Sequence, residues 1–256
     1  MEENNKPKYG YKYPRPAVTT DCVIFGFDVE EGILKVLLIE RGLEPFKSKL
    51  ALPGGFIRIQ AKTNEHGLVI EEINESLEDC AKRELQEETG LKVNYIDELG
   101  TWSTPGRDPR CITITDAYYA LVALQPVKGG DDAQDAKWFK FDNLINIISN
   151  LPEGMHFLAF DHDEIVMKAL TRLQQQLCFQ PIAFDLLPKR FTMPTLQRLY
   201  EAILGRNFDR RNFARKMLDA QILDVVDASS KAIFYQFNRK KYEEFRQTNR
   251  LSNLIF

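Results

Sequence analysis

The segment from Arg83 to Leu91 has residue types and spacing that suit metal chemistry. On a helix, at about 100° per residue, Glu84 and Glu88 project into the same arc as the apolar residues. Burying unpaired carboxylates is unfavourable, so glutamates in an apolar stripe need a compensating cation. Three acids at i, i+3 and i+4 offer hard oxygen ligands for Mg²⁺ or Mn²⁺ shared with substrate phosphates: Glu84, Glu87 and Glu88. The alternative is an exposed, salt-bridged acidic helix.

A predicted helix over residues 76–89 positions these side chains. Ser76, with Asp79 three residues later, matches a capping box, and Gly90 stands where a left-handed cap would end the helix. The buried stripe is expected to consist of Leu77, Ala81 and Leu85. The arginine that opens the segment lies four residues before Glu87 and can pair with it.

The elements around this helix are mostly strands. Runs rich in β-branched and aromatic residues are typical of strands, and the glycine turn 53–56 interrupts one of them. A second helix is predicted over 163–178. The predicted strands cover residues 17–27, 33–39, 93–99, 112–124 and 136–141. The body of the protein is therefore expected to be mixed α+β.

The acidic segment resembles the second half of the signature of the Nudix hydrolases, G-x5-E-x7-R-E-U-x-E-E-x-G-U, where U is aliphatic. Every fixed position from Glu75 onward matches. The resemblance implies an α/β/α sandwich that hydrolyses a nucleoside diphosphate linked to another moiety. It also implies that Glu84, Glu87 and Glu88 bind Mg²⁺ or Mn²⁺, oriented by Arg83 and Glu75. The metal ion would neutralise the pyrophosphate and activate a water.

The first glycine of the signature is displaced. Val69 stands six residues before Glu75, and the matching Gly55 lies fourteen residues too early. Extended runs flank residues 64–67, which predicts a hairpin-like insertion over about 57–73 within the glycine loop. Gly54 and Gly55 are expected to lie in the substrate site. An insertion that blocks water or substrate would instead leave a catalytically silent sensor.

Two arginines on a predicted turn are candidates for substrate binding. Arg107 and Arg110 could clamp phosphate or ribose oxygens, although a surface turn with helpful charge is the alternative. This stretch resembles that of Nudix ADP-ribose pyrophosphatases and their regulator relatives. The resemblance implies a nucleotide-sugar ligand such as ADP-ribose, hydrolysed to AMP and ribose 5-phosphate. Asp161 and His162 lie in a stretch with the same resemblance and are interpreted as capping and packing groups. Candidates for the general base are Asp131, Asp132 and Asp135.

Charge divides the 256-residue chain into two parts. Residues 1–170 carry 19 Lys and Arg against 29 Asp and Glu, a net charge of −10, whereas residues 171–256 carry 15 against 8, a net charge of +7. Such an asymmetry suggests different partners, with nucleic acid at the basic end. The stretch 179–191 has two prolines and no sustained period. We therefore expect one domain over 1–178 and a second over 179–256.

The basic part has the element order of a winged helix-turn-helix: predicted helices over 194–204 and 210–218, then a hairpin over 222–237. The second helix could lie in a major groove, reading base edges and contacting phosphates through Arg210, Arg211, Asn212, Arg215 and Lys216. The domain order resembles Nudix-related transcriptional regulators, which implies a double-stranded DNA operator and a homodimer. A basic dimerisation or docking domain is the alternative.

Composition excludes several other classes. The chain is 44% hydrophobic and 28% charged, which excludes a disordered protein. Four widely spaced cysteines and three histidines suggest neither a disulfide framework nor a zinc site. No apolar run is long enough for a membrane span, and the polar start predicts no signal peptide, so a cytoplasmic protein is expected.

Together, these patterns predict a dimeric regulator that responds to ADP-ribose or a related phosphosugar and also hydrolyses its pyrophosphate. The alternatives are a plain Nudix hydrolase that uses the winged-helix module for dimerisation, and the silent sensor.

Overall fold

A mixed seven-stranded sheet forms the centre of the N-terminal part of the computed structural model, which describes residues 13, 15–63, 69–93, 95–127, 133–228 and 232–247. The central strand β1 (Ala17–Asp28) pairs in parallel with β8 (Thr113–Ala123) and antiparallel with β2 (Ile33–Arg41). The remaining strands are β7 (Tyr95–Trp102) on β8, β4 (Gly54–Phe56) on β1, and both β3 (Leu50–Ala51) and β9 (Ala133–Lys140) on β2.

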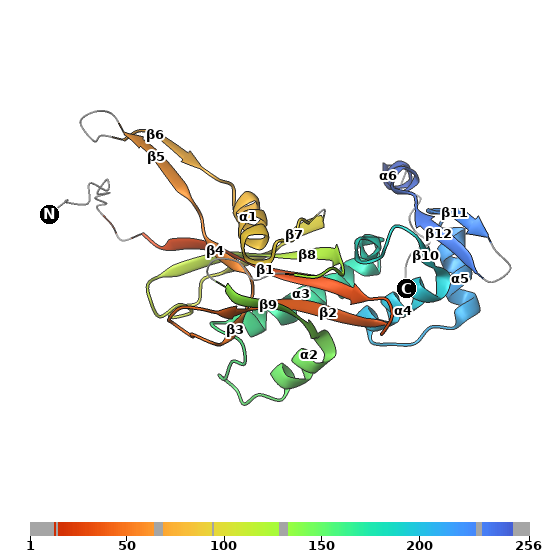
Figure 1. The fold of residues 1–256 in the computed structure, drawn as a ribbon, viewed down its shortest axis with the longest axis horizontal. Helices are drawn as coiled ribbons and strands as arrows, with labels where there is room; N and C mark the ends of the chain where they lie inside the picture. Colours follow the sequence, from red (N-terminus) through yellow and green to blue (C-terminus); the bar gives the residue numbers. More distant parts are fainter. Residues whose placement is uncertain are drawn as a thin grey trace.

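Helices cover both faces of this sheet (Figure 1). Alternate residues of a strand point to opposite faces, and those of β1 enter two different cores. Cys22 and Ile24 pack in the cluster that holds α1 (Leu77–Thr89), whereas Phe25 and Phe27 pack in the cluster that holds α2 (Phe141–Ser149) and α3 (His162–Leu177). A strand buried on both sides reads as a nearly continuous apolar run. The predicted α/β/α sandwich is confirmed.

Helix α1 begins and ends where the sequence predicts. The Ser76 hydroxyl accepts a hydrogen bond from the Asp79 backbone N–H at 3.1 Å. Gly90 closes the helix at a φ of 73°, a left-handed conformation that glycine adopts without steric cost. Both caps are local features of the chain, and they fix which residues of the acidic segment face the sheet.

Strands β5 (Ile59–Thr63) and β6 (Val69–Asn74) pair antiparallel in the range expected for the insertion and extend away from the body as a ribbon (Figure 1). The base of this ribbon is closed: the Arg58 N–H donates to Glu75 Oε1 at 2.7 Å, and the Glu75 N–H donates to the Arg58 carbonyl at 3.4 Å. The chain therefore leaves and returns at one point. Gly55 and Glu75 stay close in space although the insertion separates them in sequence.

The C-terminal part has the winged-helix order with one additional strand. β10 (Phe191–Thr192) precedes α4 (Met193–Leu204) and α5 (Arg210–Asp219), and it pairs with β12 (Ile233–Phe237), which also pairs with β11 (Leu223–Ala228). The chain continues as α6 (Arg239–Gln247). The sequence did not predict α2, β10 or α6. α2 follows β9 directly, and its N-cap residue Lys140 makes no side-chain cap, so no start signal marks it.

The segment predicted as a junction is packed. It contains the short 3₁₀ helix η1 (Ile182–Leu186), and Ile182, Phe184 and Leu187 are buried. One hydrophobic cluster runs from Phe25 through η1 to Tyr235, so the two parts share a continuous core. Within the ranges that the structure describes, no helix has the length and apolar character needed to cross a membrane.

Candidate functional site

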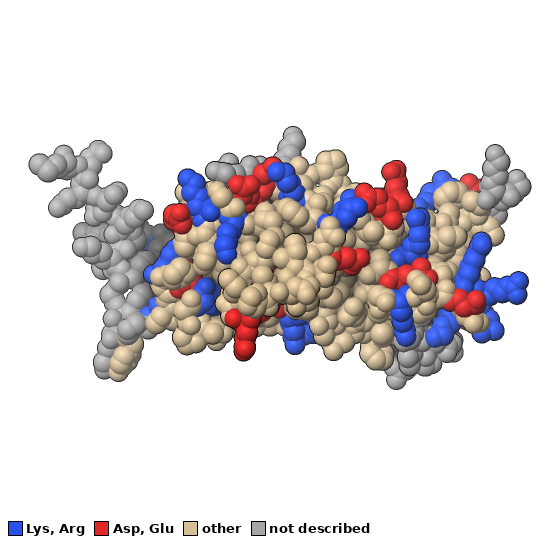
Figure 2. Space-filling view, turned by 90° about the horizontal axis from the view of Figure 1, so that it is seen from below, with Lys and Arg blue, Asp and Glu red and all other residues tan. Residues whose placement is uncertain are grey.

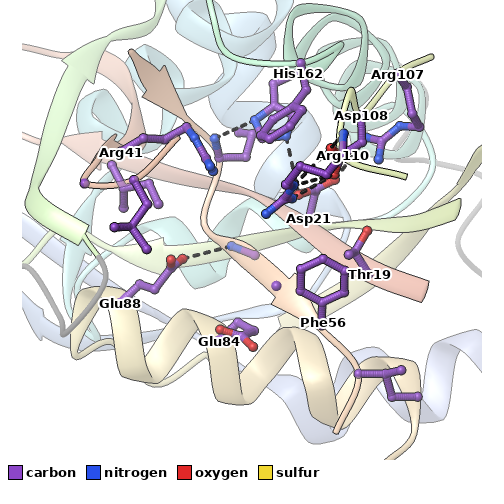
Figure 3. A pocket seen from close by; sticks show the side chains of 18 of the residues that line it. Thr19, Asp21, Arg41, Phe56, Glu84, Glu88, Arg107, Asp108, Arg110 and His162 are labelled. Carbon is purple, nitrogen blue, oxygen red and sulfur yellow. Dashed lines mark hydrogen bonds and ion pairs between the residues drawn. The ribbon is translucent and has the colours of Figure 1, made fainter. Parts of the chain in front are cut away.

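A pocket of about 370 Å³ opens between α1, β4 and the loops at the ends of β2 and β8 (Figure 3). Glu84 and Glu88 line it from α1. Arg41 lines it from the end of β2, and Arg110 and Phe160 line it from loops. The pocket thus presents carboxylates on one side and guanidinium and aromatic groups on the other.

Glu84 and Glu88 lie on the inward face of α1, as the helical periodicity predicts. Glu88 is only 9% exposed and the side chain of Glu84 15%. The Gly54 N–H donates to Glu88 Oε2 at 2.9 Å (Figure 3), and Arg83 Nη1 donates to Glu84 Oε1 at 2.6 Å. Both carboxylates are therefore held in place while they face the pocket.

The two glycines of β4 allow this close approach. A Cβ on Gly55 would lie 2.5 Å from Glu84 Oε1, and a Cβ on Gly54 would lie 2.2 Å from the Thr20 carbonyl oxygen. Any side chain would push β4 away from β1 and α1. Despite the inserted ribbon, Gly54 and Gly55 thus lie against the glutamates.

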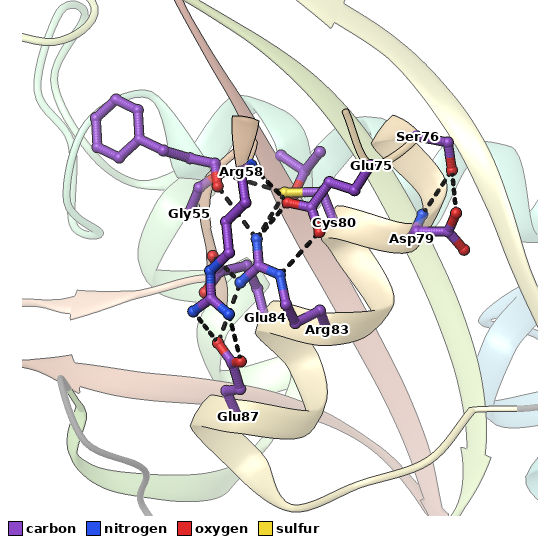
Figure 4. Close-up of polar contacts among 11 residues, drawn as sticks. Gly55, Arg58, Glu75, Ser76, Asp79, Cys80, Arg83, Glu84 and Glu87 are labelled. Atoms are coloured by element: carbon purple, nitrogen blue, oxygen red, sulfur yellow. Dashed lines mark hydrogen bonds and ion pairs between the residues drawn. The ribbon is translucent and has the colours of Figure 1, made fainter. Parts of the chain in front are cut away.

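Arg83 links the acidic residues around the base of the inserted ribbon (Figure 4). Its Nε and Nη2 donate to the two oxygens of Glu75 at 2.9 and 2.5 Å, and its Nη1 contacts both Glu84 and Glu87. The predicted contact between Arg83 and Glu87 is confirmed at 3.1 Å. Hydrogen bonding from Arg83 lowers the pKa of Glu75 to about 2, and bonding to Glu75 raises the pKa of Arg83. Glu75 stays ionised and holds the arginine.

Glu87 has different surroundings from the other two acids. It does not line the pocket, and its side chain is 44% exposed. Its two oxygens accept hydrogen bonds from Arg58 Nη1 and Nη2 at 3.0 and 2.8 Å, in addition to the contact with Arg83 (Figure 4). The structure brings two of the three predicted metal ligands to the pocket and turns the third toward two arginines. The sequence analysis missed Arg58, whose position three residues after Gly55 was the available signal.

The pocket fits a divalent metal ion that is shared with a ligand. Among the residues that the structure describes, no three His, Cys, Asp or Glu side chains converge closely enough to hold a metal by themselves. Mg²⁺ is usually bound through one or two carboxylates together with substrate phosphates and waters. Two inward carboxylates on adjacent turns of one helix, Glu84 and Glu88, meet that requirement.

Arg107 occupies the pocket wall rather than its opening. Its side chain is 4% exposed, and its Nε and Nη2 donate to the two oxygens of Asp161 at 2.9 and 2.7 Å. Nη2 also contacts Asp21 Oδ2 at 3.3 Å. The guanidinium of Arg107 is thus paired with two buried carboxylates while it lines the pocket, and its role as a ligand clamp stays a prediction. The sequence analysis missed Asp21, although an acid inside the apolar run of β1 was a signal.

Asp161 and His162 belong to the same buried network. Asp161 stands at the N-cap of α3 but makes no side-chain cap, so its interpretation as a capping group is wrong. His162 is buried in the core: its Nδ1 accepts a hydrogen bond from the Leu52 N–H at 2.9 Å, and its Nε2 lies 3.4 Å from Asp21 Oδ1 (Figure 3). Because Nδ1 accepts, the proton is on Nε2 and points to Asp21.

The buried network around Asp21 predicts that the free energy of unfolding depends on pH. Burial alone would raise the pKa of Asp21, but its electrostatic interaction and hydrogen bond with His162, together with the charge of Arg107, lower it to about 2. A lowered carboxyl pKa stabilises the fold above about pH 4 and loses its effect as the pH falls through about 2. We expect Asp21→Asn to lower the free energy of unfolding by roughly 2 kcal/mol at pH 7. Denaturant unfolding at several pH values checks this, and a difference that is constant down to pH 2 would contradict it.

Arg110 remains at the pocket opening. Its guanidinium forks onto Asp108 at 2.7 to 3.2 Å and lies over the rings of Phe56 and Phe160, with Cζ 5.3 and 5.7 Å from their centroids. The side chain is 40% exposed, so it stays accessible to a ligand.

The structure leaves the general base unassigned. Asp131 and Asp132 lie outside the described residues. Asp135 pairs with Lys137 at 2.5 Å and does not line the pocket.

Helix α5 presents its basic side chains outward. Arg210, Arg211, Asn212, Arg215 and Lys216 are all exposed, whereas Phe213 and Met217 are buried in the shared core. Asp209 caps the helix by accepting from the Asn212 N–H at 2.9 Å. On the face drawn in Figure 2, Lys and Arg gather at the end of the molecule formed by the C-terminal part. The five predicted residues thus share one accessible helix.

Family models match both parts of the chain. Residues 15–159 match the model described as the NUDIX domain, and residues 183–237 match the NrtR DNA-binding winged helix domain. The first match covers more than half of the chain.

Two curated relatives agree with these models. The ADPR responsive transcriptional repressor NtrR of Acinetobacter baylyi is 30% identical over 237 residues, which cover 90% of this chain and 86% of the relative. The ADP-ribose pyrophosphatase of Methanocaldococcus jannaschii is 37% identical over 154 residues, which cover 60% of this chain and 73% of the relative.

Two solved structures of Shewanella oneidensis NrtR are similar to this chain. Its complex with a 27mer DNA superposes with a TM-score of 0.66 at 29% identity, covering 86% of this chain and 93% of that one. Its Nudix domain complexed with ADP ribose superposes with a TM-score of 0.50 at 32% identity, covering 64% of this chain and 94% of that one.

Proposed function

Because the chain belongs to the Nudix family and carries an NrtR-type winged helix domain behind its Nudix domain, we propose that it is a DNA-binding transcriptional regulator that responds to ADP-ribose. The observation that carries this proposal is the combination, on one shared core, of a pocket with charges of both signs and an exposed basic helix. We place the domain boundary between residues 178 and 179 and take the active form to be a homodimer.

The pocket suits a dinucleotide-like ligand. A diphosphate needs positive charge on more than one side, and the pocket offers guanidinium groups opposite two carboxylates that suit a metal ion. The exposed ring of Phe56 and the neighbouring Phe160 offer flat apolar surfaces to a base or a sugar. The relatives from Acinetobacter and Shewanella support ADP-ribose as that ligand.

The proposal includes hydrolysis of ADP-ribose by water to AMP and ribose 5-phosphate. A bound Mg²⁺ would supply charge neutralisation at the diphosphate and acidify a water. The chain's own residues orient the site: Gly54 N–H holds Glu88, Arg83 holds Glu84, and Glu75 holds Arg83. The pyrophosphatase relative supports this part of the proposal.

Two assays on the wild-type protein test the proposal against its alternatives. The first follows AMP release from ADP-ribose with Mg²⁺, and the second follows binding to double-stranded DNA from upstream of the regulated genes, with and without ADP-ribose. DNA binding that responds to ADP-ribose without AMP release would indicate a silent sensor. AMP release without DNA binding would indicate a plain hydrolase whose winged helix serves dimerisation.

Contacts between the two domains offer a route for the response. Helix α3 starts at the pocket wall with His162, and its later turn reaches α4, where Gln174 Nε2 donates to the Ile203 carbonyl at 2.9 Å. From α4, Arg198 Nη2 donates to the Val29 carbonyl at 3.0 Å, at the turn between β1 and β2. A ligand can change the affinity for DNA only if it binds more tightly to one relative arrangement of the two domains than to another.

We expect Arg198→Ala to weaken this coupling. Removing the guanidinium breaks the bridge to the β1–β2 turn but touches neither the pocket nor α5. The factor by which ADP-ribose changes the Kd for DNA, typically about 5- to 150-fold in allosteric proteins, should fall toward 1, while each ligand alone binds as before. Fluorescence anisotropy of labelled DNA with and without ADP-ribose measures this factor, and Lys168→Ala, an exposed cation of α3, is the control. An unchanged factor would count against this route.

A further inference from the structure

The two residues between β3 and β4 control where Glu88 is held. β3 pairs with β2 and β4 pairs with β1, so Leu52 and Pro53 carry the chain from one strand to the other. Because proline has no backbone N–H, the Leu52 N–H is the only backbone donor of this link. Gly54 follows, and its N–H donates to Glu88 Oε2 at 2.9 Å. The position of the link therefore sets the position of that donor.

A side chain, rather than a neighbouring strand, accepts the Leu52 N–H. His162, the first residue of α3, accepts it through Nδ1 at 2.9 Å. Leu52 is 2% exposed and His162 3%, and a buried N–H that loses its acceptor is unfavourable. The next carbonyl, that of Pro53, accepts from the Cys22 N–H at 2.8 Å. Helix α3 and strand β1 thus hold the link from two sides.

Asp21 sets the orientation of the imidazole. Its Oδ1 lies 3.4 Å from His162 Nε2 (Figure 3), and a proton on Nε2 leaves the lone pair of Nδ1 for the Leu52 N–H. Asp21 is held in turn by Arg107, whose Nη2 lies 3.3 Å from Oδ2. Both ring nitrogens of His162 therefore have partners, although the side chain lines the pocket. This arrangement suits a group that supports the site and does not itself touch the ligand.

We propose that His162 is a positioning residue for metal binding. Through the Leu52 N–H it fixes the link between β3 and β4, so that the Gly54 N–H holds the Glu88 carboxylate toward the pocket, and Asp21 selects the tautomer that makes this possible. This inference rests on the proposed function, in which Glu88 is a metal ligand. Partners that orient a ligand typically change metal affinity or activity by about 10- to 100-fold.

Two substitutions of His162 separate its two hydrogen bonds. In His162→Asn the amide oxygen takes the place of Nδ1 and can accept from Leu52, but the side chain is too short to donate to Asp21. In His162→Gln the amide nitrogen takes the place of Nε2 and can donate to Asp21, but no acceptor remains for Leu52. Each variant thus loses one hydrogen bond, and only the second loses the bond to the link.

We expect His162→Gln to raise the Kd of Mn²⁺ alone, measured by electron paramagnetic resonance, by about 10- to 100-fold. Its kcat for AMP release should fall more than its KM for ADP-ribose rises, whereas His162→Asn should stay close to wild type in both. Leu173→Ala is the control, since Leu173 is buried on the same helix and does not line the pocket. It should lower the stability in denaturant and leave the Kd of Mn²⁺ unchanged.

Equal losses of Mn²⁺ affinity in His162→Gln and His162→Asn would overturn the inference and assign His162 to general support of the fold. Wild-type affinity in His162→Gln would also overturn it. If the wild-type protein binds no Mn²⁺, the metal-dependent part of the proposed function fails and the inference falls with it. The failure of the inference alone is therefore distinguishable from the failure of the proposed function.

A measurement on the wild-type protein covers the case in which His162→Gln does not fold. The chain has three histidines, so long-range ¹H–¹⁵N correlation spectra of protein labelled at histidine can be assigned through the signals that His162→Asn lacks. We expect the proton of the His162 ring on Nε2, both with and without Mg²⁺. A proton on Nδ1 would overturn the inference, because that nitrogen could then not accept from Leu52.

Discussion

Replacing Glu88 by Gln is expected to reduce Mg²⁺-dependent AMP release from ADP-ribose by at least about 100-fold while the protein stays folded. The buried carboxylate faces the pocket and, in the proposed function, would supply one of two charges for a metal ion. The amide has nearly the same shape, and its oxygen can still accept from the Gly54 N–H that Glu88 Oε2 now binds at 2.9 Å. The change therefore removes charge without removing the hydrogen bond that positions β4.

Steady-state kinetics at saturating Mg²⁺ and metal binding followed with Mn²⁺ check this prediction. Glu78→Gln is the matched control, because Glu78 lies on the same helix but is exposed and pairs only with Lys82 among the described residues. AMP release by Glu88→Gln at the wild-type rate would remove the hydrolytic part of the proposal.

Glu87→Gln tests whether Glu87 has a different role from Glu84 and Glu88, which line the pocket. Glu87 itself does not line the pocket, and it contacts Arg58, which does, and Arg83, which does not. A smaller loss of activity than in Glu88→Gln is expected if Glu87 acts by holding the arginines. An equal loss of activity would indicate that Glu87 is itself a metal ligand.

Replacing Arg211 and Arg215 together by Ala is expected to weaken binding to double-stranded DNA by at least about 100-fold, since each charged hydrogen bond contributes about 1.5–3 kcal/mol. Both side chains are exposed on α5, and Phe213 and Met217, which anchor the helix in the core, are unchanged. For each phosphate that the variant no longer neutralises, the slope of log K against log salt should fall by about 0.9. If either arginine instead reads a base, its removal should relax sequence preference.

Fluorescence anisotropy over a series of salt concentrations separates these effects. The wild-type protein should show a steep slope and prefer an inverted repeat with half-sites about one helical turn apart. Lys168→Ala, on α3, should leave both slope and affinity unchanged. Weak binding by the wild type with no dependence on salt would favour a dimerisation role for the winged helix.

The parts of the site that follow from local sequence were predictable. Helical periodicity places Glu84 and Glu88 in the apolar stripe of α1, and the Ser76 and Gly90 caps set the ends of that helix. The same reasoning holds for α5, where Asp209 caps a helix whose apolar residues lie on one side and whose basic residues lie on the other. These properties depend on interactions between residues close together in the chain.

The parts that depend on distant residues were not predictable in this way. Arg107 has the same residue type and turn context as Arg110, yet Asp161, 54 positions along the chain, pairs with Arg107 and buries it. The ribbon could have displaced the glycine loop, but the hydrogen bonds between Arg58 and Glu75 close its base. Neither outcome has a signal in the periodicity of the chain.

The sequence by itself determined the family signature, the inward direction of two glutamates and the basic face of α5, because a helix repeats its geometry every few residues. Only the tertiary structure decided which charged groups are already paired. Ionic contacts form wherever the fold brings opposite charges together, and long-range packing sets those positions. The fold turned Glu87 toward Arg58 and buried Arg107 against Asp21 and Asp161.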